Sequence, residues 1–382
     1  MAELRFWSAL SLAASPDGIV ADLRRQLRAG GGPLDLAVAF IRPSETELAE
    51  PIMRALRRDL GVAHFLACTS ESVVGAGREV EGQVATSLLA ARLPGVRIDP
   101  LPALAEGPPA FETPAQELAA VVALADPFSV RVNRLAELYN TAAPGVPLLG
   151  GVVSWASESG QNRLAQDDVV TNHGAVGFVL SGDLDVRVVV SQGCRAIGKP
   201  LTVTAAQGNV VTALDGASPL AVLRALYAES DDATQRLLRA GVLVGRSIVR
   251  DPGAVARGAF LIRSIIGADA ESGAVAVGDR VEVGDVVQFH VRDGTTARED
   301  LELLLTSQAF EAPAAGALLF TCNGRGSRMY GYPDGDVQIL QRALGHDVPV
   351  AGFFCAGELG PIGGENFVHG FTASLGMFRS KR

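Results

Sequence analysis

The sequence has little lysine, few aromatic residues and no long uncharged apolar run. Lys199 and Lys381 are the only lysines among 33 basic residues in a chain of 382, and aromatic residues make up 5%. A membrane-spanning helix needs roughly 18 consecutive apolar residues, and we find no such run, so we expect no transmembrane segment. The net charge of −9 repels phosphate backbones, which argues against nucleic acid as a partner.

The sequence also lacks closely spaced cysteines. Its four cysteines, Cys68, Cys194, Cys322 and Cys355, lie far apart and form no CxxC pair. This spacing excludes a dense disulfide framework and is typical of a reducing compartment. We therefore expect a cytoplasmic protein.

Three catalytic motifs are absent or incomplete. The sequence has neither the GxSxG elbow of serine hydrolases nor the HExxH helix of zinc peptidases. Residues 193–199 (GCRAIGK) match the GxxxxGK pattern of a phosphate-binding loop. However, Pro200 stands where Ser or Thr would hold Mg²⁺, and the LTVT that follows predicts a strand where that loop needs a helix. The sequence therefore implies no nucleotide, metal or other cofactor.

Apolar residues make up 48% of the chain and charged residues 20%, as in a folded protein with an ample core. Residues 34–41 form an apolar run that predicts a buried strand, residues 48–60 have helical spacing, and residues 62–68 predict the next strand. We expect further helices at 115–124 and 129–139, and strand-rich segments over 146–210 and 242–291. These alternations indicate an α/β layered architecture.

An internal repeat is visible. Residues 146–150 (VPLLG) resemble residues 348–352 (VPVAG), and each is followed by a strand end, a loop of small residues, a His-Gly step and another apolar strand. Residues 62–89 form a weaker third copy. We therefore predict an α/β (α+β) fold in which two strand-rich halves are related by internal duplication, with layered sheets covered by helices.

The segment 321–326 (TCNGRG) is the first candidate site. It follows a predicted buried strand, and ligands of α/β proteins usually bind where strands end. Cys322, Asn323 and Arg325 can point into a crevice, while Gly324 leaves backbone N–H groups free. An arginine beside bare amides suits a carboxylate or another anion. The alternative is a tight turn with a solvated arginine.

Two further segments add candidates. Residues 355–361 (CAGELGP) present Glu358 in a loop of small residues, where it could accept an ammonium group or form an ion pair with Arg325. Arg292 precedes a turn at Gly294, and an N-cap role for the neighbouring Asp293 explains that segment equally well. The predicted ligand-binding residues are Cys322, Asn323, Gly324, Arg325, Glu358 and Arg292.

These segments together resemble the FIST family. The resemblance rests on GCRAIGKPLTVT and GNVVTALDG in the first half, and on GAFLIRSIIG, TCNGRG and FFCAGELGPIGGENFVHGFTASL in the second. It implies a FIST N-terminal domain at 1–233 and a FIST C-terminal domain at 234–382. FIST domains are proposed to sense small ligands such as amino acids, and many are joined to kinase, cyclase, chemotaxis or F-box modules. The matched segments leave no room for such a module in this chain.

Three functions follow as alternatives. The resemblance favours a sensory module that binds an amino acid or small carboxylate and acts through a separate signalling protein. Cys322 beside Arg325 leaves open a cysteine-dependent enzyme, although no histidine lies near it in sequence. The third alternative is an interaction scaffold without a ligand. The sequence does not determine the oligomeric state.

Overall fold

The computed structural model describes residues 3–27, 33–102, 107–256, 258–308, 310–344 and 348–381. The chain divides into two compact units. Unit 1 comprises residues 1–191, 300–368 and 372–382, and unit 2 comprises residues 192–299 and 369–371. Unit 2 therefore consists of one long and one short segment that interrupt the sequence of unit 1.

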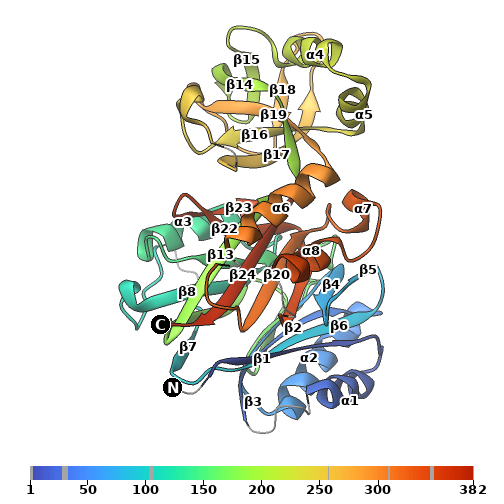
Figure 1. Cartoon of the computed structure of the whole chain (residues 1–382), viewed down its shortest axis with the longest axis vertical. Helices are drawn as coiled ribbons and strands as arrows, with labels where there is room; N and C mark the ends of the chain where they lie inside the picture. The colour runs from blue at the N-terminus through green and yellow to red at the C-terminus, as the bar shows by residue number, and fades with distance from the viewer. Residues whose placement is uncertain are drawn as a thin grey trace. The chain divides into compact units, whose positions relative to one another are not determined.

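Unit 1 is built from three successive sets of strands (Figure 1). The first set is β1 (Arg5–Ser11), β2 (Leu34–Arg42), β3 (Val62–Thr69), β4 (Ser72–Gly75), β5 (Arg78–Glu81) and β6 (Ala85–Arg92). The second is β7 (Val96–Pro100), β8 (Leu118–Ala125), β9 (Leu148–Val152), β10 (Leu164–Gln166), β11 (Val169–Thr171) and β12 (Ala175–Gly182). The third is β13 (Leu184–Gln192), β20 (Gly316–Cys322), β21 (Val350–Cys355), β22 (Gly357–Ile362), β23 (Glu365–His369) and β24 (Thr372–Ser380).

The three sets form three six-stranded sheets with one topology. Their strand orders are β1-β6-β2-β3-β10-β11, β7-β12-β8-β9-β22-β23 and β13-β24-β20-β21-β4-β5. In each sheet the central pair, β2/β3, β8/β9 or β20/β21, runs parallel. Each set also contributes its hairpin, β4–β5, β10–β11 or β22–β23, to the sheet of another set. The fold is thus a threefold repeat with exchanged hairpins.

Helices pack on the outer face of each sheet. They are α1 (Pro16–Leu27) and α2 (Thr46–Leu60) on the first sheet, α3 (Val132–Ala142) on the second, and α6 (Gly294–Gln308) and α8 (Gly335–Leu344) on the third. In α2, Ile52 and Leu56 lie four residues apart and are buried, and Gly61 ends the helix in the left-handed conformation. Among the described residues, no helix has both the length and the apolar content needed to cross a bilayer.

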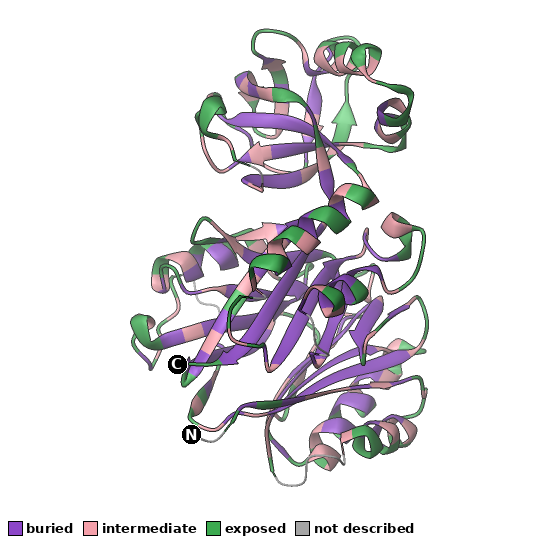
Figure 2. Ribbon diagram, viewed as in Figure 1, coloured by how far each residue is buried: buried purple, intermediate pink, exposed green. Residues whose placement is uncertain are grey.

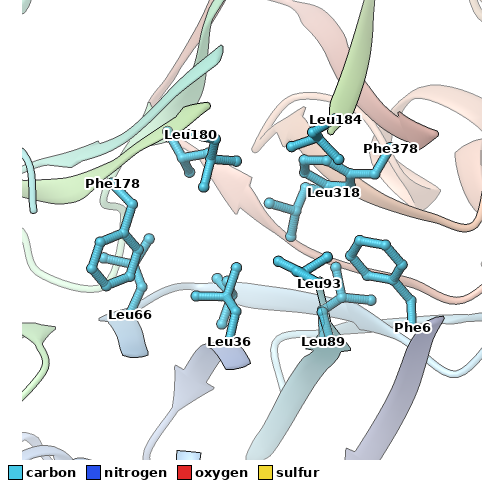
Figure 3. A pocket seen from close by; sticks show the side chains of 13 residues that line it. Phe6, Leu36, Leu66, Leu89, Leu93, Phe178, Leu180, Leu184, Leu318 and Phe378 are labelled. Carbon is cyan, nitrogen blue, oxygen red and sulfur yellow. The ribbon is translucent and has the colours of Figure 1, made fainter. Parts of the chain in front are cut away.

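The main core lies between the three sheets. Side chains such as Leu36 and Leu66 from the first sheet, Phe178 from the second, and Leu318 and Phe378 from the third point toward one another (Figure 3). The strands around them are buried along most of their length (Figure 2). They leave a cavity of about 10 Å³ with an almost wholly apolar lining. A space of that size holds at most one water molecule, so the centre of unit 1 is filled by side chains.

Unit 2 is a closed six-stranded barrel with the strand order β14-β15-β18-β17-β16-β19. Its strands are β14 (Cys194–Gln207), β15 (Val210–Leu214), β16 (Val242–Ser247), β17 (Phe260–Ala268), β18 (Val275–Val277) and β19 (Val286–Arg292). Helices α4 (Pro219–Glu229) and α5 (Asp232–Ala240) pack on its outside. His290 in β19 is buried against the Phe260 ring, and burial lowers its pKa to about 4.

The predicted fold class is confirmed: the chain is a mixed α/β protein with layered sheets covered by helices. The internal repeat is also present, and the segment predicted as a weak third copy is a complete member. Residues 194–199 belong to β14, and the LTVT segment at 201–204 is part of the same strand, as predicted. The helix predicted at 115–124 is wrong, because residues 118–125 (LAAVVALA) form β8. That run is buried on both faces, and burial in the sheet overrides the helix propensity of its alanines.

Candidate functional site

The candidate site lies where the parallel strands of the third sheet end. The buried runs GALLFTC and VAGFFC form β20 and β21, whose last residues, Cys322 and Cys355, are partners in register. The chain then turns into β22, which leaves this sheet and pairs with β9 of the second sheet, so that Glu358 lies opposite Gly151. The hairpin exchange therefore brings Glu358 to the carboxyl ends of β20 and β21.

Arg325 forms a buried ion pair with Asp336. Its Nε and Nη2 atoms lie 2.9 and 2.6 Å from the two carboxylate oxygens, and both side chains have 0% exposure. The Tyr330 hydroxyl donates to the same carboxylate at 2.7 Å, and so does the Thr321 hydroxyl at 2.7 Å. Burial opposes the charge of Arg325, but the Asp336 carboxylate outweighs it and raises the pKa of Arg325. The pair is therefore charged and neutralises itself.

The loop between β20 and α7 (Ser327–Tyr330) needs glycine at residue 326. Gly326 has φ 61°, and a Cβ atom there would lie 2.7 Å from the Phe354 ring and 2.8 Å from the Glu81 carboxylate. Glu81 accepts hydrogen bonds from the backbone N–H and hydroxyl of Ser327. The loop is thus held by a hairpin from the first repeat, and this fixes the position of Arg325.

Glu358 is a fully buried carboxyl group. Its Oε2 atom accepts hydrogen bonds from the backbone N–H and the hydroxyl of Thr372, at 3.2 and 2.7 Å. Burial raises the pKa of Glu358 to about 8, although those hydrogen bonds, the charge of Arg325 and the thiol of Cys322 act in the opposite direction. Glu358 is therefore mostly protonated and uncharged at pH 7.

Cys322 and Cys355 interact with this carboxyl group, and Cys68 interacts with Cys355. Cys322 interacts with Glu358 and accepts a hydrogen bond from the backbone N–H of Gly324 at 3.4 Å. Burial raises the pKa of Cys355, and the neighbouring Glu358, Cys68 and Cys322 raise it further. Among the described residues, no group of three or more His, Cys, Asp or Glu side chains has a geometry that could hold a metal ion.

Gly151 is required for this arrangement. A Cβ atom at that position would lie 2.4 Å from the Cys355 sulfur and 3.1 Å from the Phe353 ring. Any larger residue at position 151 would therefore displace Cys355 and, through it, the neighbours of Glu358. The site thus depends on contacts between the second and third sheets as well as on the loops.

Three buried polar atoms of the site have no hydrogen-bond partner among the described residues. They are Oδ1 of Asn323, Nη1 of Arg325 and Oε1 of Glu358. Leaving such atoms unpaired costs roughly 1–3 kcal/mol each. The cluster is next to the surface, because Asn323 is half-buried and Ala356 is exposed. Two acceptors and one cationic donor are therefore left unpaired in this cluster.

The structure brings five of the six predicted site residues together: Cys322, Asn323, Gly324, Arg325 and Glu358. Arg292 belongs to unit 2, where it ends β19 and its guanidinium lies 6.0 Å from the centre of the Phe371 ring. Its role in ligand binding stays a prediction. The ion pair considered between Arg325 and Glu358 is not formed, since the carboxylate partner of Arg325 is Asp336.

Sequence reasoning missed Asp336, Thr372 and Cys68 as members of the site. Asp336 is in the first turn of α8, where an acidic residue is expected because it stabilises the helix N-terminus. Its position in the sequence therefore gave no indication of a role in the site. Cys68 occupies the end of β3, and the weak third repeat was the one available signal for it. Thr372 begins β24 two residues after Gly370 of the His-Gly step and carried no signal of its own.

The three sheets define an α/β repeat protein with a buried polar cluster at its strand ends, and comparison with known proteins gives the family. Residues 35–217 match the FIST N domain, and residues 219–361 match the FIST C domain. The chain therefore belongs to the FIST family. The two matches meet inside unit 2, so the family segments and the compact units divide the chain differently.

The relatives found are themselves uncharacterised. A protein of Mycobacterium tuberculosis is 40% identical over 362 residues, which cover 93% of both chains. A protein of Mycobacterium bovis is 37% identical over 358 residues, covering 92% of both chains. A solved structure entitled "Cyanuric acid hydrolase: evolutionary innovation by structural concatenation" aligns over 99% of this chain and 100% of that chain, with 11% identity and a TM-score of 0.31.

Proposed function

We propose that this FIST protein is a sensory module that binds a small zwitterion, such as an amino acid, or a small carboxylate at the Glu358–Arg325 cluster. One observation carries the proposal: two buried groups of opposite character, both next to Cys322, each keep one unpartnered polar atom. Membership of the FIST family favours a sensory role, and we further propose that a separate signalling protein receives the signal.

The charges of the site favour a ligand without net charge. At pH 7 Glu358 is mostly protonated and Arg325 is neutralised by Asp336, so the cluster is close to neutral. A ligand carboxylate would accept from Nη1 of Arg325, and a ligand ammonium group would donate to Oε1 of Glu358 and Oδ1 of Asn323. An ammonium group stabilises the ionised carboxyl, so zwitterion binding at pH 7 should release a proton.

Two measurements test the proposal. Native mass spectrometry of the purified protein looks for a co-purified small molecule. Thermal shifts are then recorded with the standard amino acids and with small carboxylates. A ligand at about 100 times its dissociation constant adds about 2.7 kcal/mol of stability, which gives a visible shift. Calorimetry in two buffers of different ionisation enthalpy then counts the released protons. No bound mass and no shift with any compound would overturn the proposal.

Two matched variants locate the site. Glu358→Gln removes the ionisable group but keeps its shape, and should abolish the ligand shift. Glu79→Gln removes another buried carboxyl whose pKa burial also raises to about 8, and should leave the shift intact. Arg325→Ala is unsuitable, because it leaves the buried Asp336 carboxylate without its partner. Equal effects of the two glutamine variants would place the ligand elsewhere.

A second candidate function is thiol chemistry at Cys322. Two observations favour it: Glu358, which can accept a proton in its ionised form above a pH of about 8, interacts with the thiol, and the Gly324 N–H can stabilise a thiolate. Burial raises the pKa of Cys68 and Cys355, so these two should stay inert in the folded protein. The test is the rate of iodoacetamide alkylation at Cys322, followed by mass spectrometry. A rate no faster than in the unfolded chain would exclude activation.

A further inference from the structure

The outer surface of unit 2 carries an apolar groove along helices α4 and α5, which are labelled in Figure 1. It has a volume of about 470 Å³ and lies wholly within unit 2. Its lining consists of Leu220, Leu223, Arg224, Tyr227, Leu238, Arg239 and Val242. Five of these seven side chains are aliphatic or aromatic, so the groove offers an apolar floor to a partner.

Helix α4 is more exposed to solvent than is usual for so apolar a helix. Its sequence, PLAVLRALYAE, is apolar on nearly every side, and such helices are normally enclosed by protein. In α4, however, Pro219 is the single residue classed as buried, and Leu220 and Leu223 are half-buried. Figure 2 shows the helix in the colours of intermediate and exposed residues. The apolar side chains of α4 that line the groove pack against the barrel on one side and stay partly open to solvent on the other, as at many interaction sites.

The charged residues that line the groove are both arginines. Arg224 is exposed and makes no ion pair or hydrogen bond in the part of the chain that the structure describes. Arg239 donates to the Tyr227 hydroxyl and lies 5.3 Å from the centre of that ring, with no carboxylate partner among the described residues. By contrast, Arg263 of the same unit lies 2.9 Å from the Asp279 carboxylate. The groove therefore carries two guanidinium charges that no carboxylate balances.

We propose that this groove binds an acidic amphipathic helix of a partner protein. Apolar side chains at every third or fourth position of that helix would contact Leu223 and Val242, and flanking carboxylates would reach Arg224 and Arg239. Charge argues against a second copy of this chain as the occupant, because a twofold contact would bring like arginines together. The proposal concerns a surface other than the small-molecule site and does not depend on it.

The test uses the full chain and two synthetic peptides. Each peptide is a fluorescein-labelled amphipathic helix of about 18 residues, with leucines at helical spacing and glutamate at the other positions, or lysine in the matched control. Anisotropy titrations give the dissociation constants at low and high salt. We expect the glutamate peptide to bind at least tenfold more tightly than the lysine peptide, with the difference shrinking at high salt.

Variants of the groove make the result specific. The double substitution Arg224→Glu and Arg239→Glu should reverse the preference in favour of the lysine peptide, and Leu223→Ser should weaken both. The matched control is Arg236→Glu, which lies on α5 like Arg239 but outside the groove lining. It should change the dissociation constant of neither peptide. Equal binding of the two peptides, or unchanged binding in the double variant, would overturn the proposal. Dimerisation of the wild-type chain that Leu223→Ser abolishes would assign the groove to a second copy instead.

Discussion

Replacing Glu358 with glutamine should make the protein more stable. In the folded chain Glu358 holds a proton because burial raises its pKa from the ordinary value of 4.5 to about 8. In the unfolded chain the same carboxyl is ionised and hydrated at pH 7. Folding must therefore bind a proton at neutral pH, which costs free energy. Glutamine is neutral in both states, and its amide oxygen can still accept the two hydrogen bonds from Thr372.

The size of the effect follows from proton linkage. Between pH 4.5 and about 8 the folded state binds more protons at Glu358 than the unfolded state, so the free energy of unfolding falls as the pH rises. Each pH unit in this window corresponds to about 1.4 kcal/mol. The carboxyl therefore costs about 3 kcal/mol at pH 7 and about 5 kcal/mol above pH 8. Below pH 4.5 the cost disappears.

The assay is urea unfolding followed by circular dichroism at several pH values between 4.5 and 8.5. Wild type should lose stability steadily across this range. Glu358→Gln should show a shallower profile and exceed wild type most at the alkaline end. Glu79→Gln is the control for burial, because the pKa of Glu79 is also raised to about 8 and its carboxyl accepts the backbone N–H of Val337. It should gain stability similarly.

Two results would refute this reasoning. The first is a Glu358→Gln variant that is no more stable than wild type at pH 7. The second is a variant whose stability still follows the wild-type pH profile, which would show that the carboxyl is already ionised in the folded state. If the gain in stability appears together with loss of the ligand shift, Glu358 is retained for binding at the expense of stability.

Three further predictions concern the framework. Burial lowers the pKa of His290 from 6.5 to about 4. The free energy of unfolding of unit 2 should therefore fall by up to about 3 kcal/mol as the pH drops from 6.5 to about 4. Hydrogen exchange of the β16 and β19 amides, corrected for intrinsic rates, measures this loss. Asp336→Ala should cost about 3–5 kcal/mol in urea unfolding, because it leaves Arg325 buried and unpaired; an effect under about 1 kcal/mol would contradict the ion pair. Phe353→Ala should cost about 3–5 kcal/mol, since its ring stacks on Phe40 at 5.1 Å; a thermal shift of less than roughly 2 °C would show that the core can collapse around it.

Much of the fold could be predicted from local patterns. The VPLLG and VPVAG segments revealed two copies of the repeat because proline, glycine and the apolar strand recur in the same order. The third copy was weaker because its strand begins VAHFL and has no proline. The error at residues 115–124 has a physical cause. An alanine-rich run between two apolar layers satisfies either a helix or a buried strand, and the tertiary environment decides.

The site was predictable in part. Cys322, Arg325 and Glu358 were found because each lies where an apolar run gives way to a loop of small residues, a pattern that can be recognised in a sequence. The partner of Arg325 was not readable, because Asp336 belongs to a helix N-terminus eleven residues later. Nor was the state of Glu358, whose raised pKa depends on burial. That burial arises where strands of separate repeats meet, which no local pattern encodes.

The exchange of hairpins has a consequence for how the chain folds. The hairpin β4–β5 comes from the first repeat, yet its partner in the sheet is β21, near the other end of the chain. The hairpin β4–β5 therefore has no partner strand until β21 of the last repeat has been synthesised. Contacts of such long sequence separation slow folding. A fragment limited to the FIST N segment, residues 35–217, would lack β20, β21 and β24 altogether. The third sheet takes strands from both family segments, so we expect neither segment to fold without the other.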